Sequence, residues 1–166
     1  MAVYFNELND GSHFSVNSEL KFSLTHYLKI GISTALLKQN ENNPGFIDSQ
    51  IIFKGSSNPS PSGMIINQFY TIKDLIYRML AENDLCAKEL LIPLIEIKVL
   101  KNVCDAIQIK IPDAPDKQFE LNVVDCSKFF KMFYNSGFLS INDSEFMLQL
   151  LTKTKFKNGI IKNIST

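Results

Sequence analysis

The stretch "CSKFFKMFYNSGFLSINDSEFMLQLL", residues 126–151, decides the fold of the C-terminal part of the chain. Its apolar residues recur with the 3.6-residue period of a helix, and Asn142 or Asp143 offers a side-chain cap for the start of a second helix. The pattern therefore predicts two helices, over about 126–136 and 143–153. Both apolar faces are wide, so the two helices can bury each other as a pair.

The same two helices carry more apolar surface than a helix docked on one sheet needs. The excess lies at the margins of the two apolar faces. Apolar side chains that stay exposed there would mark an interface with another protein. The candidate residues for such a partner-binding surface are Met132, Tyr134, Phe138 and Leu148.

The segment "TIKDLIYRMLAEN", residues 71–83, has the clearest helical pattern in the chain. Thr71 and Asp74 have the spacing of a capping box. Apolar residues follow at i, i+3, i+4, i+7 and i+8, which predicts a helix that docks by one face. These apolar residues are Ile72, Leu75, Ile76, Met79 and Leu80.

Three shorter segments, at 94–100, 106–111 and 119–124, alternate apolar and polar residues. A period of two residues is typical of a half-buried strand. Because the connections between the segments are short and polar, they predict an antiparallel meander over about 94–124.

These patterns together predict an α+β fold with a predominantly antiparallel sheet. The helices about 71–83, 126–136 and 143–153 are expected to pack against that sheet. The length of 166 residues is that of one domain, so residues 1–166 are interpreted as a single α+β domain.

The region 14–33 allows two interpretations. Its even positions are mostly apolar, which favours two strands or one bent strand. The alternative is a helix that begins at Glu19, with Ser18 as its N-cap. Further along, "SQIIFKG", residues 49–55, is a candidate for a short strand.

Two segments are expected to be mobile. The stretch "GSSNPSPSG", residues 55–63, is rich in Gly, Ser and Pro and predicts a flexible surface loop. The basic tail, residues 157–166, is expected to fray.

The composition limits the classes of function. The net charge is zero, and Arg78 is the only arginine. Nucleic-acid binders usually have a basic excess and use arginine to recognise phosphates and bases, so nucleic acid is not an expected partner. The sequence shows no signal peptide and no apolar run of membrane-spanning length, so we expect a cytoplasmic protein without membrane contact.

One motif suggests catalysis. Glu96-Ile97-Lys98 is an E-x-K sequence, and on a strand its two charged side chains would share one sheet face. With Asp84 upstream, it resembles the signature of metal-dependent nucleases of the restriction-endonuclease-like family. That resemblance implies carboxylates that hold Mg²⁺ and a lysine that helps to position the attacking water. The predicted strands after Lys98 depart from the family pattern, in which a helix follows.

The other candidates for chemistry are few. His26 falls on the apolar phase of its segment, which favours a half-buried structural histidine. Cys104 is expected in a hairpin loop, and the neighbouring Asp105 would raise its thiol pKa and oppose nucleophilic use. The sequence contains no phosphate-binding loop, zinc motif or nucleophile elbow. The three cysteines have no metal-binding spacing, and we expect buried free thiols, no metal and no cofactor.

An acidic cluster completes the list of candidate sites. It consists of Asp105, Asp113, Asp116 and Glu120, at one edge of the predicted meander. Such a patch could steer a basic partner protein. Without a catalytic set, the sequence predicts a non-catalytic protein-binding domain, most concretely an immunity protein or inhibitor that masks the active site of a bacterial toxin. The alternatives are a secretion chaperone, a phage-encoded inhibitor, or a Mg²⁺-dependent nuclease that uses Glu96 and Lys98.

Overall fold

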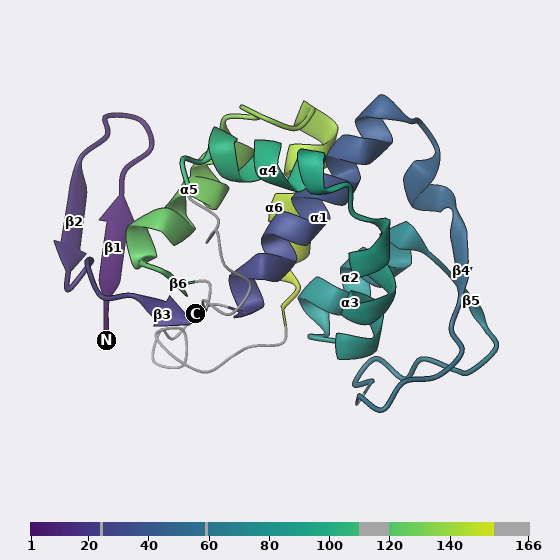
Figure 1. Cartoon of the computed structure of the whole chain (residues 1–166). Coiled ribbons are helices and arrows are strands. Elements are labelled where there is room, and N and C mark those ends of the chain that lie inside the picture. The colour runs from purple at the N-terminus through teal and green to yellow at the C-terminus, as the bar shows by residue number, and fades with distance from the viewer. Residues whose placement is uncertain (24, 59, 110–119, 155–166) are drawn as a thin grey trace.

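The computed structural model describes residues 1–23, 25–58, 60–109 and 120–154. Within these ranges the chain combines six α-helices with three two-stranded antiparallel pairs, which confirms the predicted α+β class (Figure 1). The helices are α1 (Thr25–Asn42), α2 (Ile72–Ala81), α3 (Leu85–Leu91), α4 (Ile97–Ala106), α5 (Val123–Tyr134) and α6 (Ile141–Thr152), with short 3-10 helices η1 (Phe46–Asp48) and η2 (Ile92–Leu94).

The strands form three small pairs instead of one continuous sheet. They are β1 (Val3–Asn6) with β2 (His13–Val16), β3 (Phe22–Ser23) with β6 (Glu120–Leu121), and β4 (Gln50–Ile52) with β5 (Phe69–Thr71). In Figure 1 the β1–β2 hairpin stands beside α5, and the β4–β5 pair lies at the opposite end of the molecule. The short strand expected at 49–55 is confirmed by β4.

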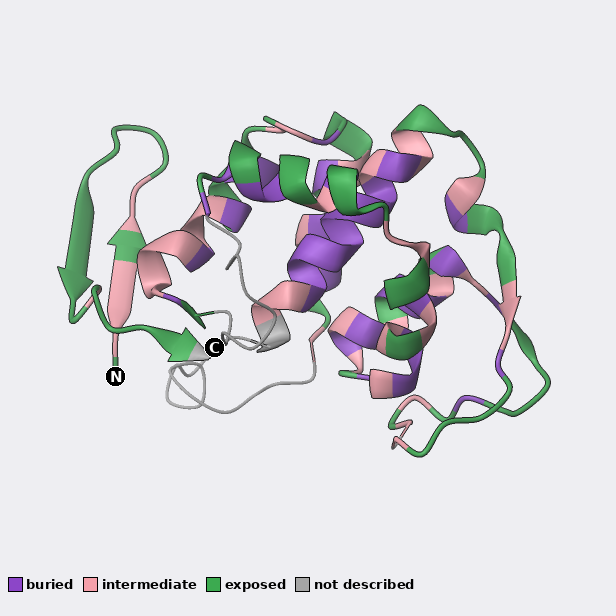
Figure 2. Cartoon of the chain, viewed as in Figure 1, coloured by how far each residue is buried: buried purple, intermediate pink, exposed green. Residues whose placement is uncertain are grey.

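Helix α1 is the centre of the core. Every residue from Ile30 to Leu37 is buried, so this part of the helix is covered on all sides (Figure 2). Helices α2 and α4 pack against it, α3 packs on α2, and α5 packs on α6. A helix that is enclosed in this way needs no polar face.

This enclosure explains why the region 14–33 was ambiguous. The strand interpretation is correct for β2 and β3 but wrong for the residues after them, which belong to α1. The helix interpretation is correct in type, but the helix begins at Thr25 and not at Glu19. Because the central part of α1 is buried all round, its apolar residues fit a period of two as well as a helical period.

Helix α2 matches its prediction closely. The backbone N–H of Asp74 donates to the side-chain oxygen of Thr71 at 3.0 Å, as expected for an N-cap. Four of the five predicted apolar residues are buried: Ile72, Leu75, Ile76 and Met79.

The predicted meander over 94–124 is wrong for most of its described part. Residues Ile97–Ala106 form helix α4, and only Glu120–Leu121 belongs to a strand, β6. Val99 and Val103, four residues apart, are buried on one face of α4, while Ile97 is 72% exposed. Isoleucine and valine favour strands only weakly, and packing against α1 overrides that preference.

Helices α5 and α6 confirm the interpretation of the 126–151 stretch, with both helices starting slightly earlier than expected. The cap of α6 is Ser140, whose hydroxyl accepts from the backbone N–H of Asp143 at 3.2 Å, and not Asn142 or Asp143. Among the described residues, no helix has the length and apolarity required to cross a membrane.

The apolar residues at the margins of this helix pair are covered to different degrees. Met132 is buried, Phe138 and Leu148 are half-buried, and Tyr134 is 56% exposed. Phe130, which the pattern places at the centre of the buried face, is 41% exposed. Core packing therefore accounts for most of the aromatic residues in this stretch.

The predicted flexibility of the 55–63 loop and the single-domain organisation stay predictions. The tail at 157–166 lies outside the described residues.

Candidate functional site

A buried lysine joins the first turns of α1 to the turn between α2 and α3. The side chain of Lys29 belongs to a residue that is only 4% exposed, and its Nζ donates to Oδ1 of Asn83. Asn83 has φ 57°, a left-handed conformation that asparagine tolerates better than most residues. The tight turn that this conformation allows places the Asn83 amide against α1.

The electrostatic environment lowers the pKa of Lys29. Burial is the largest cause, because removal from water disfavours the charged ammonium group, and the nearby charge of Lys88 acts in the same direction. The carboxylate of Asp84 partly opposes both effects. A buried lysine of this kind gives up a proton more easily than a surface lysine.

Asp84 holds the turn between α2 and α3 in place by hydrogen bonds. It is fully buried and serves as the N-cap of α3, where Oδ1 accepts from the backbone N–H of Ala87 at 3.1 Å. Its Oδ2 accepts from the hydroxyls of Ser60 and Ser62, at 2.6 and 2.5 Å. Burial raises the pKa of Asp84, but these hydrogen bonds outweigh it, so the pKa is lowered overall and the carboxylate stays ionised.

The 55–63 loop is also bonded to helices α2 and α3. Nη1 of Arg78 donates to the carbonyl oxygen of Ser62 at 2.9 Å, and Nε of Arg78 donates to Asp74 at 2.7 Å. On the other side of the loop, the Ser56 hydroxyl donates to Glu89 at 2.6 Å. The only arginine of the chain thus holds the 55–63 loop.

The geometry defines a helical α+β domain with a buried lysine near the start of its central helix. Comparison with known proteins then identifies the family: the model of the "Beta-lactamase enzyme family" matches residues 1–166. The chain therefore belongs to the β-lactamase enzyme family. No curated protein shows a significant match to it.

Solved structures of β-lactamases share this fold. The enzyme of Sphaerobacter thermophilus superposes with a TM-score of 0.82 at 17% identity, over 99% of this chain and 67% of that one. A β-lactamase of Francisella tularensis gives 0.76 at 16% identity, over 93% and 64% of the two chains. The TLA-1 extended-spectrum β-lactamase gives 0.75 at 15% identity, over 93% and 63%. The chain thus spans about two thirds of the length of these structures.

The family match overturns the predicted class of function. The chain belongs to a family of enzymes, so the expectation of a non-catalytic immunity protein, toxin inhibitor or antitoxin is wrong. The same finding removes the chaperone and phage-inhibitor alternatives.

The nuclease alternative also fails on geometry. Glu96 is the N-cap residue of α4 and Lys98 lies inside that helix, so the two residues do not share a strand face. Asp84, the third residue of that hypothesis, is occupied as a buried cap. Among the described residues, no group of three or more His, Cys, Asp or Glu side chains is arranged to hold a metal ion.

Lys29, Asn83 and Asp84 form what we call the Lys29 cluster, and the other described candidate site residues are not part of it. Asp105 and Glu120 are exposed, while Asp113 and Asp116 lie outside the described residues. Their proposed role in partner binding, together with that of Met132, Tyr134, Phe138 and Leu148, stays a prediction. Cys104 is buried in α4 and not exposed in a hairpin, and burial raises the pKa of its thiol to about 11. All three cysteines are free and buried, as expected.

The motifs of serine β-lactamases are only partly present in this sequence. Those enzymes carry S-x-x-K, with the serine as nucleophile, together with S-D-N and K-T-G. Here Lys29 lies three residues after His26, so a histidine stands where the nucleophile would be. The turn before α3 reads Asn83-Asp84-Leu85, which keeps only the aspartate of S-D-N, and K-T-G does not occur in the 166 residues.

Proposed function

We propose that this chain is the helical part of an acyl hydrolase of the β-lactamase type, with its catalytic centre at the start of α1. The observation that supports this proposal is the buried Lys29 side chain, which is bonded to Asn83 and lies near the ionised Asp84. A protein seldom buries an ionisable amine without a use for it, and perturbed pKa values gather at catalytic sites.

His26 is the residue that we assign to activation of the nucleophile. It is the second residue of α1 and lies three positions before Lys29 in the sequence, the spacing of the serine and the lysine in S-x-x-K. Histidine is the most frequent general base in enzymes. In the proposed reaction, His26 takes a proton from a water molecule, and the hydroxide oxygen bonds to the acyl carbon of the substrate.

Lys29 completes the proton balance. The bond between the acyl carbon and the leaving nitrogen or oxygen breaks, and the leaving atom takes a proton from the Lys29 ammonium group. The proton that His26 took from water then passes through solvent to the Lys29 amine, which restores both residues. The lowered pKa of Lys29 makes that transfer easier than it would be from a surface lysine. Asn83 orients the amine, and Asp84 holds the turn that carries Asn83.

Hydrolysis of a chromogenic cephalosporin and of a nitrophenyl ester tests the proposal. We expect turnover by the wild-type chain and a loss of at least about 100-fold in kcat/KM in Lys29→Met and in His26→Ala. Lys101→Met, at an exposed position of α4, is the matched control and should keep wild-type activity. Absence of hydrolysis by the folded wild-type chain would refute the proposal, and so would equal activity in Lys29→Met and Lys101→Met.

A further inference from the structure

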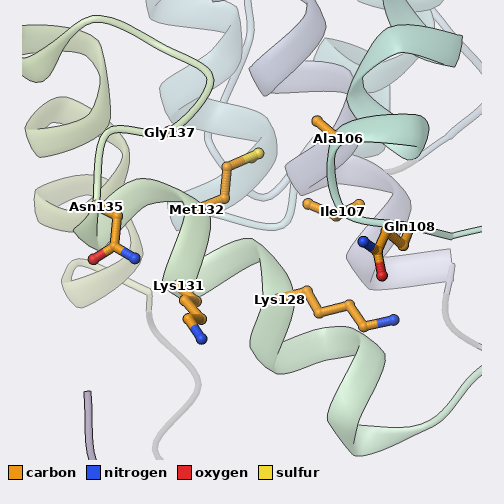
Figure 3. A pocket seen from close by; sticks show the side chains of 8 residues that line it. All are labelled: Ala106, Ile107, Gln108, Lys128, Lys131, Met132, Asn135 and Gly137. Atoms are coloured by element: carbon orange, nitrogen blue, oxygen red, sulfur yellow. The ribbon is translucent and has the colours of Figure 1, made fainter. Parts of the chain in front are cut away.

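We propose that a groove between the end of α4 and helix α5 binds a small amphipathic anion, namely a carboxylate with a short apolar chain. The groove has a volume of about 370 Å³, within the range of small-molecule sites. Figure 3 shows that it lies between the Ile107–Gln108 turn and the outer side of α5. Lys29 does not line it, so this inference is independent of the proposed function.

The groove has an apolar centre. Met132 on α5 and Ile107 after α4 line it, and their exposed fractions are only 8% and 4%. Both side chains are therefore held by the core and offer a fixed apolar surface to a ligand. An apolar chain of a few carbon atoms would gain free energy there in proportion to the area that it buries.

Among the described residues, the polar part of the lining has positive charge and amides but no carboxylate. Lys128 and Lys131 are three residues apart on α5, and Gln108 and Asn135 contribute amides. Nζ of Lys128 is bonded to Asp125 at 2.7 Å, which neutralises its charge. Lys131 has no ion pair among the described residues, and its side chain is exposed. The unneutralised charge of the groove is thus that of Lys131.

The backbone around the groove is already shaped by hydrogen bonds. Gln108 has φ 55°, and the flanking N–H of Ile109 donates to the carbonyl oxygen of Cys104 at 2.8 Å. At the other end, the N–H of Asn135 donates to Lys131 and closes α5. A ligand therefore needs little reordering of the protein, which lowers the cost of binding.

These features indicate how the ligand is oriented. The carboxylate accepts charge-assisted hydrogen bonds from Lys131 and the side-chain amide of Asn135. The apolar chain lies over Met132 and Ile107. A cation of the same length would bring its charge beside the unneutralised charge of Lys131, so the site should reject it.

Isothermal titration of the wild-type chain with sodium octanoate tests this inference. We expect binding with a Kd of about 1 mM or tighter, at least tenfold weaker binding in Lys131→Met, and a smaller effect in Lys128→Met. Lys153→Met, at an exposed position beyond α6, is the control and should bind as the wild type does. Octyltrimethylammonium, which has the same chain length and the opposite charge, should not bind.

Three results would overturn the inference. They are an absence of octanoate binding to the folded wild-type chain, equal affinity in Lys131→Met and Lys153→Met, and equal affinity for the octyl cation. Because the readout is binding and the variants lie away from Lys29, failure here leaves the hydrolase proposal untouched. Likewise, failure of the hydrolysis test leaves the inferred binding site untouched.

Discussion

The Lys29 cluster and the β1–β2 hairpin differ in the kind of residue that each buries or exposes. At the cluster, two charged residues, Lys29 and Asp84, are 4% and 0% exposed. On the hairpin, the cross-strand pair Phe5 and Phe14 is 60% and 61% exposed. A buried charge is costly and needs a reason, whereas an isolated two-stranded ribbon is only marginally stable. The contrast agrees with the proposed catalytic role of the cluster, and it predicts that the exposed face of the hairpin contributes little to the stability of the fold.

The largest change in the free energy of unfolding should come from a substitution in the hydrophobic core. Phe133 on α5 is 1% exposed, and Phe133→Ala should lower the free energy of unfolding by about 3–5 kcal/mol, because it leaves a cavity. Urea denaturation followed by circular dichroism measures the loss. A loss below about 1 kcal/mol would show that α5 is not part of a packed core.

A smaller but pH-dependent effect is expected at Asp84. Asp84→Asn keeps the shape but removes the charge that accepts from Ser60, Ser62 and Ala87, so it should cost about 2 kcal/mol at pH 7. Because the pKa of Asp84 is lowered in the fold, its contribution is complete above the unfolded pKa of about 3.9 and is lost as the pH falls through the folded pKa.

Denaturation of wild type and Asp84→Asn across the acid range measures this dependence. The two stabilities should converge as the pH falls. A difference that is independent of pH would contradict the assignment of the charge, and the Glu145→Gln variant, at an exposed position of α6, is the control.

Substitution of Lys29 should change the stability in the opposite direction to substitution of Asp84. Lys29→Met removes a buried charge and should raise the stability at pH 7 by about 1 kcal/mol while it removes activity. The pKa of Lys29 is lowered in the fold, so the unfolded chain binds more protons and wild-type stability rises with pH. The gain in the variant should therefore shrink as the pH approaches the unfolded pKa of about 10.4.

Thermal unfolding of the wild type and of Lys29→Met from neutral to alkaline pH tests the predicted difference in stability. If Lys29→Met were less stable than wild type at neutral pH, the lysine would serve the fold and not the site.

The smallest effect is expected on the hairpin. Phe14→Thr replaces an aromatic residue by a β-branched residue, which also favours a strand, and should change the free energy of unfolding by no more than about 0.5 kcal/mol. Urea denaturation beside Phe133→Ala gives a direct comparison of the two regions. A loss of more than about 2 kcal/mol would mean that the exposed hairpin face is covered in solution.

Local patterns were sufficient to predict some of the fold. The capping box at Thr71 and the amphipathic stripes of α2, α5 and α6 fixed those helices, since cap and period agree with the tertiary packing. The segment of α4 misled the prediction, because its isoleucines and valines alternate and only the packing on α1 selects the helix.

The candidate site was harder to predict than the fold. Burial of Lys29 follows from the position of α1 in the core, and one sequence does not reveal which lysine will be covered. At the start of α1 a histidine stands in place of the serine of S-x-x-K, and the sequence matches this motif instead at Ser18-Glu19-Leu20-Lys21, which lies before β3. The one signal in the sequence was Asp84, a good N-cap residue that lies beside Asn83 and ahead of α3.

Our main proposal is that the start of α1 is an acyl-transfer site, in which His26 stands at the sequence position of the nucleophilic serine and activates water. The most direct test is intact-protein mass spectrometry of His26→Ser after incubation with a fluorescent penicillin, with His26→Ser/Lys29→Met as the matched control. We expect a covalent adduct that adds the full mass of the penicillin, since ring opening releases no fragment, and we expect no adduct in the double variant. If folded His26→Ser protein formed no adduct, or formed it equally without Lys29, the start of α1 would not be an acyl-transfer site.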